Sequence, residues 1–269
     1  MLANASLEWV TPEGDDLIAK MARVSNPENQ DNKKSYPRLI KYLMMNGHWS
    51  PFEMVSMCVE IETTRDIGRQ ILRHVSFRFQ EFSGRYAAYD DLHADRECRL
   101  QDETNRQSSI MLDPDNPDHA EMYDKWTLRC RAAEAQAQRD YRQSLNDGVA
   151  KECARALLPE GMVPTTMYMT GTIRSWIHYL QARTYAGAQR EHQLVALKVQ
   201  NIFSRLFPMT YAAMILPAHK DGKYHKFMSS DLGTLFDAKW DDVEERWVPR
   251  KGEGDWIDQP VPKYLVTEL

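Results

Sequence analysis

Apolar residues recur every three or four positions in six stretches of the chain, and this spacing is typical of helices with one buried side. In the stretch 119–146, for example, Met122, Trp126, Cys130, Ala137 and Tyr141 follow this period, and a turn-forming Asn-Asp-Gly ends it. We therefore predict long, packed helices. The stretches are 15–24, 35–46, 119–146, 149–159, 172–183 and 188–207.

Two other stretches predict strands. Val55, Met57, Val59 and Ile61 alternate with polar positions, which is the period of a strand with one face on a core. The stretch 163–172 carries methionines between threonines and also favours a strand. The polar segment 90–118 predicts an elaborated loop with short strands near 98–100 and 110–112.

The character of the sequence changes after Pro217. The remaining residues are charged, contain several tryptophans and are bounded by prolines. We interpret residues 1–217 as a catalytic domain and residues 218–269 as a peripheral C-terminal extension, whose secondary structure the pattern does not define.

Composition limits the possible functions. The 269 residues carry a formal charge of -5, with 42% hydrophobic and 27% charged residues, as in an ordinary globular protein. No stretch is long and apolar enough to span a membrane, so we expect a cytoplasmic location. A pI near 5.9 argues against polymeric nucleic acid as a partner. The four cysteines lack zinc-ligand spacing, so we expect reduced thiols and no metal.

Arginines concentrate against this global charge between Thr64 and Tyr86. If a helix begins after a Thr64 cap, the first three arginines lie on one face, with Asp66 and Glu62 as possible partners. Because like charges at this spacing repel, the cluster needs a counter-charge. The arginines are Arg65, Arg69, Arg73, Arg78 and Arg85.

Ser83, Gly84 and Arg85 directly follow the predicted helix region. A glycine lets backbone N–H groups approach an anion, and an arginine adds a planar two-donor fork. Two interpretations are open at this point: a phosphate-binding site, or a surface ion-pair network.

A second arginine group lies later in the chain. Arg174 and His178 share one face of a predicted helix, and Arg183 lies near its end, while Arg155 precedes them. Trp176 and its apolar neighbours indicate that this helix packs tightly. Two interpretations are open: the polar side of this helix contacts a specific partner, or it faces only solvent.

Four motifs in the same order resemble the flavin-dependent thymidylate synthases. The run from Arg73 to Arg85 is similar to the family motif RHRxxSxNxxSxR, matching at Arg73, His74, Ser83 and Arg85. The segments GHWSPFE, CARALLP and the stretch 172–191 resemble the family's GHxSPFEH, ARxxLP and NxRSxxxFxxxR…AQxE. The similarity covers about residues 15 to 216.

This resemblance implies an α+β fold with a mixed or antiparallel sheet and long packed helices, assembled as a homotetramer with active sites between subunits. It implies FAD and dUMP in the site, with NADPH and methylenetetrahydrofolate as co-substrates. Positions matching the family's nucleotide contacts are Gln70, Arg73, Glu81, Ser83, Gly84, Arg85, Arg155 and Arg183. Positions matching its flavin contacts are Ser50, Arg73, His74, the backbone at Val75, Thr172, Arg174 and His178.

The resemblance also implies a reaction without a cysteine nucleophile. In this reaction Arg183 is the catalytic residue: it polarises the pyrimidine ring, so that electron density moves to C5 and C5 becomes the nucleophile. Several positions depart from the family pattern. Val75 replaces an arginine, and we hypothesise that Arg78 compensates for the missing charge. Thr172 replaces an asparagine, and Gly187 replaces a histidine. Gln80 replaces another asparagine.

The residues leave alternatives. A related enzyme could methylate or hydroxymethylate dCMP or dUMP, because one or two hydrogen-bonding groups separate uracil from cytosine. A non-catalytic nucleotide or single-strand binder could use the same arginines with Phe77, Phe79, Phe82 and Tyr86.

Overall fold

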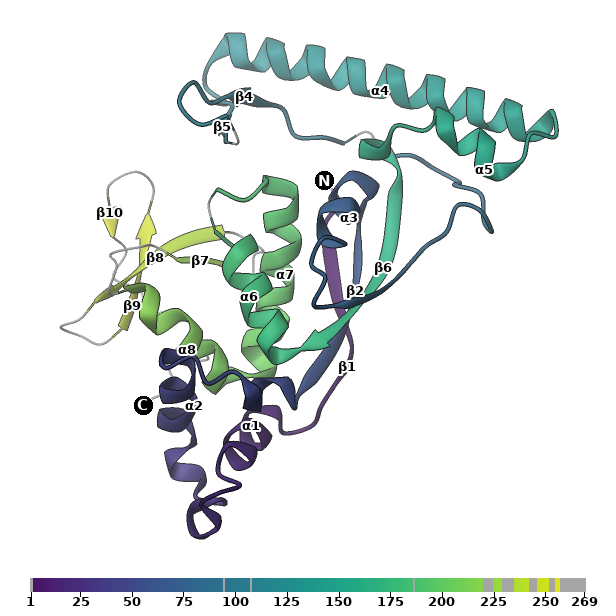
Figure 1. Ribbon diagram of the computed structural model, residues 1–269. Coiled ribbons are helices and arrows are strands. Elements are labelled where there is room, and N and C mark those ends of the chain that lie inside the picture. Colours follow the sequence, from purple (N-terminus) through teal and green to yellow (C-terminus); the bar gives the residue numbers. More distant parts are fainter. Residues whose placement is uncertain are drawn as a thin grey trace.

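The computed structural model describes residues 2–219 except positions 94, 107 and 186, and then the backbone of the segments 225–228, 235–241, 246–251 and 255–256. Helices and antiparallel strands both contribute to the fold (Figure 1). This confirms the predicted α+β class. Among the described residues, no helix combines the length and apolar character needed to cross a bilayer.

A four-stranded sheet forms the centre of the fold, in the order β1-β2-β6-β3. Every neighbouring pair is antiparallel. The long central strands β2 and β6 match the two predicted strands. Strands β1 and β3 were not predicted, because their sequences show no clear alternation of apolar and polar residues. The bounds are β1 Asn4–Val10, β2 Ser56–Thr64, β3 Arg78–Glu81 and β6 Pro164–Thr172.

The alternation along β2 places its apolar residues in the core. Val55, Met57, Val59 and Ile61 are all fully buried. Helices α6 (Ile173–Arg183) and α7 (Arg190–Leu206) lie beside this sheet (Figure 1). The buried Trp176 on α6 donates its indole N–H to the carbonyl of Met57 at 3.1 Å, which anchors the helix to the strand.

Three helices pack together below the sheet in Figure 1: α1 (Gly14–Ala22), α2 (Tyr36–Met45) and α8 (Pro208–His219). The buried Asp15 carboxylate caps α8, because it accepts hydrogen bonds from the Met209 N–H at 2.7 Å and the Thr210 hydroxyl at 2.6 Å. The 3-10 turns η1 (Pro27–Asn29), η2 (Lys33–Ser35) and η3 (Ser50–Glu53) connect these elements.

The 30-residue helix α4 (Pro117–Asn146) extends across the top of Figure 1, away from the main sheet. Its length agrees with the prediction, but its apolar stripe is only partly buried: Met122 and Trp126 are 43% and 37% exposed. The loop before α4 contains the two predicted short strands, β4 (Arg99–Gln101) and β5 (Ser109–Met111). After α4, the predicted helix 149–159 is shorter than expected and forms α5 (Lys151–Ala154) and the 3-10 turn η4 (Arg155–Leu157), and a further turn, η5 (Glu160–Met162), follows.

A second antiparallel sheet follows α8, in the order β10-β9-β8-β7, and shares no described strand with the first. Helix α8 continues through Pro217 to His219, so the predicted boundary at residue 217 lies inside a helix. The strands are β7 His225–Met228, β8 Leu235–Asp241, β9 Arg246–Lys251 and β10 Asp255–Trp256.

Candidate active site

The arginine-rich stretch forms the short helix α3 (Arg65–Ile71), so Arg73 lies beyond its end and not on a continuous helical face as predicted. The predicted counter-charges are also different. Asp66 pairs with Arg96 at 2.6 Å, and Glu62 accepts a hydrogen bond from Asn4. The Thr64 hydroxyl donates to Asp66 and does not cap the helix.

One side of α3 faces a pocket of about 440 Å3 that contains three arginines, Arg65, Arg69 and Arg155. Arg69 lies 3.4 Å from Glu160 and 3.7 Å from Glu81, whereas Arg65 donates to the hydroxyl of Tyr89. The other lining residues are Tyr89, Glu152, Ala156, Leu158, Glu160 and Val163. Two parts of the chain that are 86 residues apart therefore share one basic pocket.

The Ser83–Arg85 segment adjoins this pocket through Glu152, whose carboxylate lies 3.3 Å from Nε of Arg85. Gly84 is buried, and a Cβ at this position would approach the Tyr89 ring to 2.5 Å. Only glycine therefore lets the segment pass Tyr89. Through Glu152, Arg85 therefore lies at the edge of the pocket that Arg155 lines.

Two other predicted nucleotide residues, Glu81 and Ser83, are held by neighbours within the chain. Glu81 accepts a hydrogen bond from the Thr165 hydroxyl at 2.9 Å, which fixes it against β6. The Ser83 hydroxyl accepts from the Arg85 N–H at 3.4 Å. Arg73 is exposed just beyond α3.

Beyond the end of α3, Arg183 and His74 form a direct contact. Arg183, the last residue of α6, donates its Nε–H to Nε2 of His74 at 3.0 Å. A guanidinium cannot accept a hydrogen bond, so His74 must be the acceptor and must be neutral. Burial and the charges of Arg183 and Arg73 lower the pKa of His74 to about 4, in agreement with this contact.

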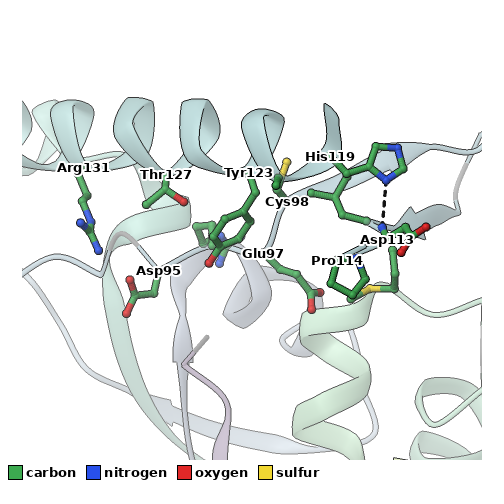
Figure 2. Close-up of a pocket in the computed structure, with 13 residues that line it drawn as sticks. Asp95, Glu97, Cys98, Asp113, Pro114, His119, Tyr123, Thr127 and Arg131 are labelled. Carbon is green, nitrogen blue, oxygen red and sulfur yellow. Dashed lines mark hydrogen bonds between the residues drawn. The ribbon is translucent and has the colours of Figure 1, made fainter. Parts of the chain in front are cut away.

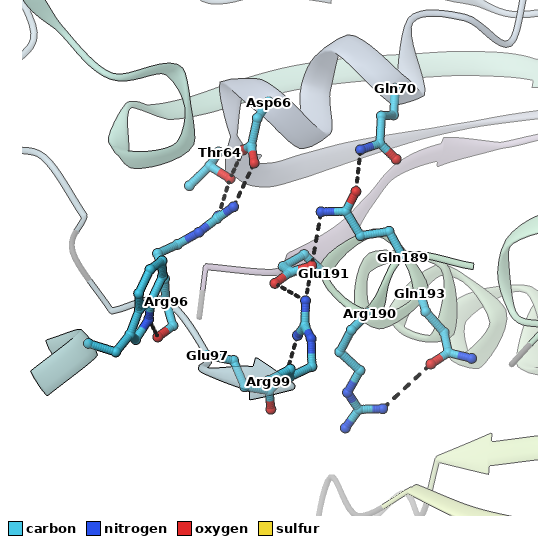
Figure 3. Close-up of polar contacts among 11 residues, drawn as sticks. Thr64, Asp66, Gln70, Arg96, Glu97, Arg99, Gln189, Arg190, Glu191 and Gln193 are labelled. Carbon is cyan, nitrogen blue, oxygen red and sulfur yellow. Dashed lines mark hydrogen bonds and ion pairs between the residues drawn. The ribbon is translucent and has the colours of Figure 1, made fainter. Parts of the chain in front are cut away.

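A polar chain runs from Gln70 on α3 to the first turn of α7 and on to Arg99 on β4 (Figure 3). Gln70 donates to Gln189 at 2.6 Å, Gln189 donates to Glu191 at 3.1 Å, and Glu191 pairs with Arg99 at 2.8 Å. Burial raises the pKa of Glu191, but the hydrogen bond from its own N–H and the Arg99 pair outweigh burial and hold the pKa below its usual range. The Glu191 carboxylate is therefore charged.

Four of the predicted cofactor residues lie around η3 and the start of α6. The Arg174 guanidinium pairs with Glu53, and the exposed His178 ring lies 4.8 Å from the ring of Trp49. Ser50 begins η3. The Thr172 hydroxyl accepts the Ser175 N–H at 3.4 Å, so it caps α6.

The loop after α3 brings the remaining cofactor positions to the same helix. The Ser175 hydroxyl donates to the carbonyl of Ser76 at 3.5 Å, which ties this loop to the first turn of α6. Val75 is 85% exposed. Arg78 folds back and donates to the carbonyls of Phe77 at 3.1 Å and Val75 at 3.5 Å, so its cation lies beside the position where the family motif has arginine.

A larger cavity, of about 750 Å3, lies below α4 (Figure 2). Its lining includes Asp95, Tyr123, Arg131 and His119, which accepts the Asp113 N–H at 3.0 Å. None of the predicted site residues lines it. Cavity size alone would therefore direct attention away from the arginine clusters.

Comparisons with known proteins agree with this geometry. Residues 6–209 match the family model described as thymidylate synthase complementing protein. A probable flavin-dependent thymidylate synthase of Paramecium bursaria Chlorella virus 1 is 44% identical over 74% of this chain and 90% of its own length. The flavin-dependent thymidylate synthase of Synechocystis sp. is 45% identical over 77% and 91%. The chain belongs to the flavin-dependent thymidylate synthase family.

A solved structure supports the same fold for this flavin-dependent thymidylate synthase family member. The UMP/dUMP methylase PolB from Streptomyces cacaoi, bound with 5-Br dUMP, has a TM-score of 0.67 and 27% identity, covering 80% of this chain and 95% of that protein.

The described residues fit a flavin cofactor. Arg174 supplies a cation for an anionic group, and the rings of His178 and Trp49 supply an aromatic surface next to the Ser76 loop. Two of the departures from the family pattern lie at positions with defined local contacts. The Thr172 hydroxyl is already used as a cap, and a Cβ at Gly187 would approach the Tyr185 ring to 2.5 Å, so the Tyr185 ring fills the space next to this glycine.

Sequence reasoning missed several residues of these clusters. It gave no role to Arg65 and Arg69 in the pocket, to the Arg99–Glu191 pair, or to Tyr179 and His192 beside His74. His192 had a detectable signal, because it shares the buried face of α7 with Val195, Ala196 and Val199.

Proposed function

We propose that this chain converts dUMP to dTMP by reductive methylation at C5, with methylenetetrahydrofolate as the one-carbon donor, FAD as the flavin and NADPH as the reductant. The observation that carries the proposal is the contact between Arg183 Nε and His74 Nε2 at 3.0 Å. It places a permanently charged donor on a rigid helix end and gives it one orientation.

In this proposal, Arg183 binds the O2 and N3 edge of the uracil ring. A cation there favours the form that has lost the N3 proton and moves electron density toward C5. The neutral His74 holds the guanidinium without competing for its charge. The bound flavin supplies redox chemistry and one-carbon transfer to the site.

The basic pocket of Arg65, Arg69 and Arg155, with Arg85 at its edge, is the proposed site for the nucleotide phosphate. The carboxylates of Glu152 and Glu160 balance these arginines in the protein without ligand. Binding a phosphate would replace these contacts with shorter, charge-assisted hydrogen bonds. Gln70, Arg73, Glu81, Ser83 and Gly84 complete the proposed nucleotide site.

The proposed cofactor site comprises Ser50, Arg73, His74, Val75, Thr172, Arg174 and His178. No thiol is required. Cys58 is 6% exposed on β2, and burial raises the pKa of its thiol, which makes it a poor nucleophile. All four cysteines are free, which agrees with the cytoplasmic location that we propose.

We further propose a homotetramer whose active sites combine residues of different subunits. Within one chain, Arg183 contacts His74 beyond the end of α3, whereas the basic pocket lies beside Arg65 and Arg69 of α3. Helix α4 also exposes Tyr123 and Leu128, at 50% and 67%, on a surface that a second copy would cover. Light scattering should then give a mass of four 31.3 kDa chains, and a monomer would contradict the assembly.

Label transfer from methylenetetrahydrofolate tests the activity. The purified protein should be yellow, with the absorption of oxidised flavin, and should transfer the labelled carbon to dUMP. Assays with UMP and with dCMP, each offered separately, show which nucleotide the enzyme accepts. UMP is included because the solved relative is described as a UMP/dUMP methylase. A colourless protein that binds single-stranded oligonucleotides in a strongly salt-dependent way would contradict the proposal.

A further inference from the structure

His192 occupies a buried position next to the proposed active site but has no role in the reaction described above. It is fully buried, and its ring centre lies 6.1 Å from that of His74 and 5.8 Å from that of Tyr179. Its Nε2 atom has no hydrogen-bond partner among the described residues. A buried histidine without a full set of partners requires an explanation.

The charged end of the polar chain defines the direction of every hydrogen bond in it. Glu191 is paired with Arg99 at 2.8 and 3.0 Å, and a carboxylate can only accept hydrogen bonds. Gln189 must therefore turn its NH2 group toward Glu191 and its oxygen toward Gln70 (Figure 3). The oxygen and nitrogen of an amide are hard to distinguish by shape, but this network leaves one assignment.

The same reasoning fixes the orientation of the Gln70 amide. Because the Gln189 oxygen accepts from Gln70 Nε2 at 2.6 Å, the Gln70 oxygen must face the other way. Nδ1 of His192 lies 3.4 Å from that oxygen, so Nδ1 must carry the hydrogen. Burial, Arg183 and His74 lower the pKa of His192 to about 3, which agrees with a neutral ring that carries its only hydrogen on Nδ1.

We propose that His192 is a positioning residue for the nucleotide site: its Nδ1–H holds the Gln70 carbonyl, so that the Gln70 amide keeps one orientation when the nucleotide binds. Gln70 is half-buried, and its second N–H has no partner among the described residues. A fixed amide presents a donor at a fixed place, whereas a free amide could present either group. This inference rests on the proposed function, in which Gln70 contacts the nucleotide.

Two substitutions separate hydrogen bonding from packing. His192→Leu removes the donor, whereas His192→Asn keeps an N–H near the place of Nδ1. We expect His192→Leu to weaken dUMP binding to the flavin-loaded protein about tenfold and His192→Asn to remain within about threefold of the wild type. Val195→Ala, at another fully buried position of α7, is the control: it should lower the Tm without changing dUMP affinity.

Equal affinities for all variants, or equal losses for His192→Leu and His192→Asn, would overturn the inference. Solid-state 15N NMR of histidine-labelled wild-type protein, with His192→Leu for assignment, tests it separately from substrate binding. The spectrum should show His192 neutral with the hydrogen on Nδ1 at both pH 6 and pH 8. If the wild type does not bind dUMP, the proposed function fails, and a charged His192 or a hydrogen on Nε2 would still overturn the proposed orientation.

Discussion

At the scale of single residues, the site depends on a few hydrogen bonds whose direction is fixed by charge. Arg183 can only donate, so His74 must accept, and Glu191 can only accept, so both glutamines are oriented. Sequence motifs identified Arg183, His74 and Gln70 as candidates. They could not identify Arg99, which is 92 residues from Glu191 in the sequence and meets it only in the fold.

The Arg99–Glu191 pair should contribute strongly to stability. Their side chains are only 14% and 6% exposed, so Glu191→Gln leaves a buried guanidinium with Glu97 as its remaining charged partner. We expect a loss of about 3 kcal/mol in the free energy of unfolding, measured by urea denaturation at pH 7. Asp91→Asn, which removes an exposed pair with Arg142, should cost less than about 1 kcal/mol.

The pH dependence of this effect has a definite sign. The folded-state pKa of Glu191 lies below its unfolded value, so its contribution is present above the unfolded pKa and is lost as pH falls through the folded one. The stability difference between wild type and Glu191→Gln should therefore shrink on acidification. A constant difference down to acid pH would contradict this account.

The charge of Arg78 should take the place of the arginine that the family motif has at position 75. Val75 is 85% exposed and can accommodate a longer side chain, and Arg78 already contacts its carbonyl. The double substitution Val75→Arg with Arg78→Ala should change flavin affinity by less than about fivefold, because one exposed cation replaces another. Arg78→Ala alone is the control and should weaken binding more. A large loss in the double variant, measured by fluorescence titration with flavin, would reject the compensation.

At the scale of elements, strongly periodic segments were predictable and weakly periodic ones were not. Strands β2 and β6 and helices α2, α6 and α7 follow their patterns, because each buries one face. Helix α4 also follows its pattern, although its apolar stripe is only partly buried. Strands β1 and β3 lie at the edges of the sheet, and their residues are mostly exposed or half-buried, so no clear period reveals them. Helix α3 ends earlier than its charge pattern suggested.

The Asp15 cap of α8 should make stability depend on pH. Burial raises the pKa of Asp15 to about 6 from 3.8, although the hydrogen bonds from Thr210 and Met209 oppose this shift. A raised pKa means that the folded chain binds more protons, so stability falls as pH rises from about 4 to 6.

Asp15→Asn removes this titration and keeps an acceptor oxygen for the helix end. Relative to this variant, the wild type should lose about 2–3 kcal/mol of unfolding free energy between pH 4 and pH 6. Urea denaturation at a series of pH values measures the difference. Asp31→Asn, at an exposed pair with Lys20, controls for the loss of one carboxylate. Parallel curves for wild type and Asp15→Asn would contradict the proposed role of this cap.

At the scale of the whole molecule, every proposed site residue lies within the residues 6–209 that match the family model. The family model ends at residue 209, and the second sheet begins at β7. The sequence indicated a change of character near this point, but the charged pattern did not reveal the antiparallel order of these strands. Nor could a single chain's pattern predict that α4 would leave so much apolar surface exposed.

A chain that ends after His219 should therefore fold and bind flavin, because it retains α8 and all the proposed cofactor residues. Flavin absorbance and the melting temperature of the purified chain measure this. A colourless or unfolded product would show that the residues after 219 are part of the catalytic domain.

The central claim is that an arginine, and not a thiol, activates the pyrimidine ring. The rate of dTMP formation by Arg183→Ala and by Cys153→Ser tests it most directly, since Cys153 is the exposed cysteine close in sequence to Arg155. With flavin content and Tm matched to the wild type, Arg183→Ala should lower the rate on the order of 10²–10³-fold, and Cys153→Ser should leave it within about twofold. An inactive Cys153→Ser together with an active Arg183→Ala would contradict the account.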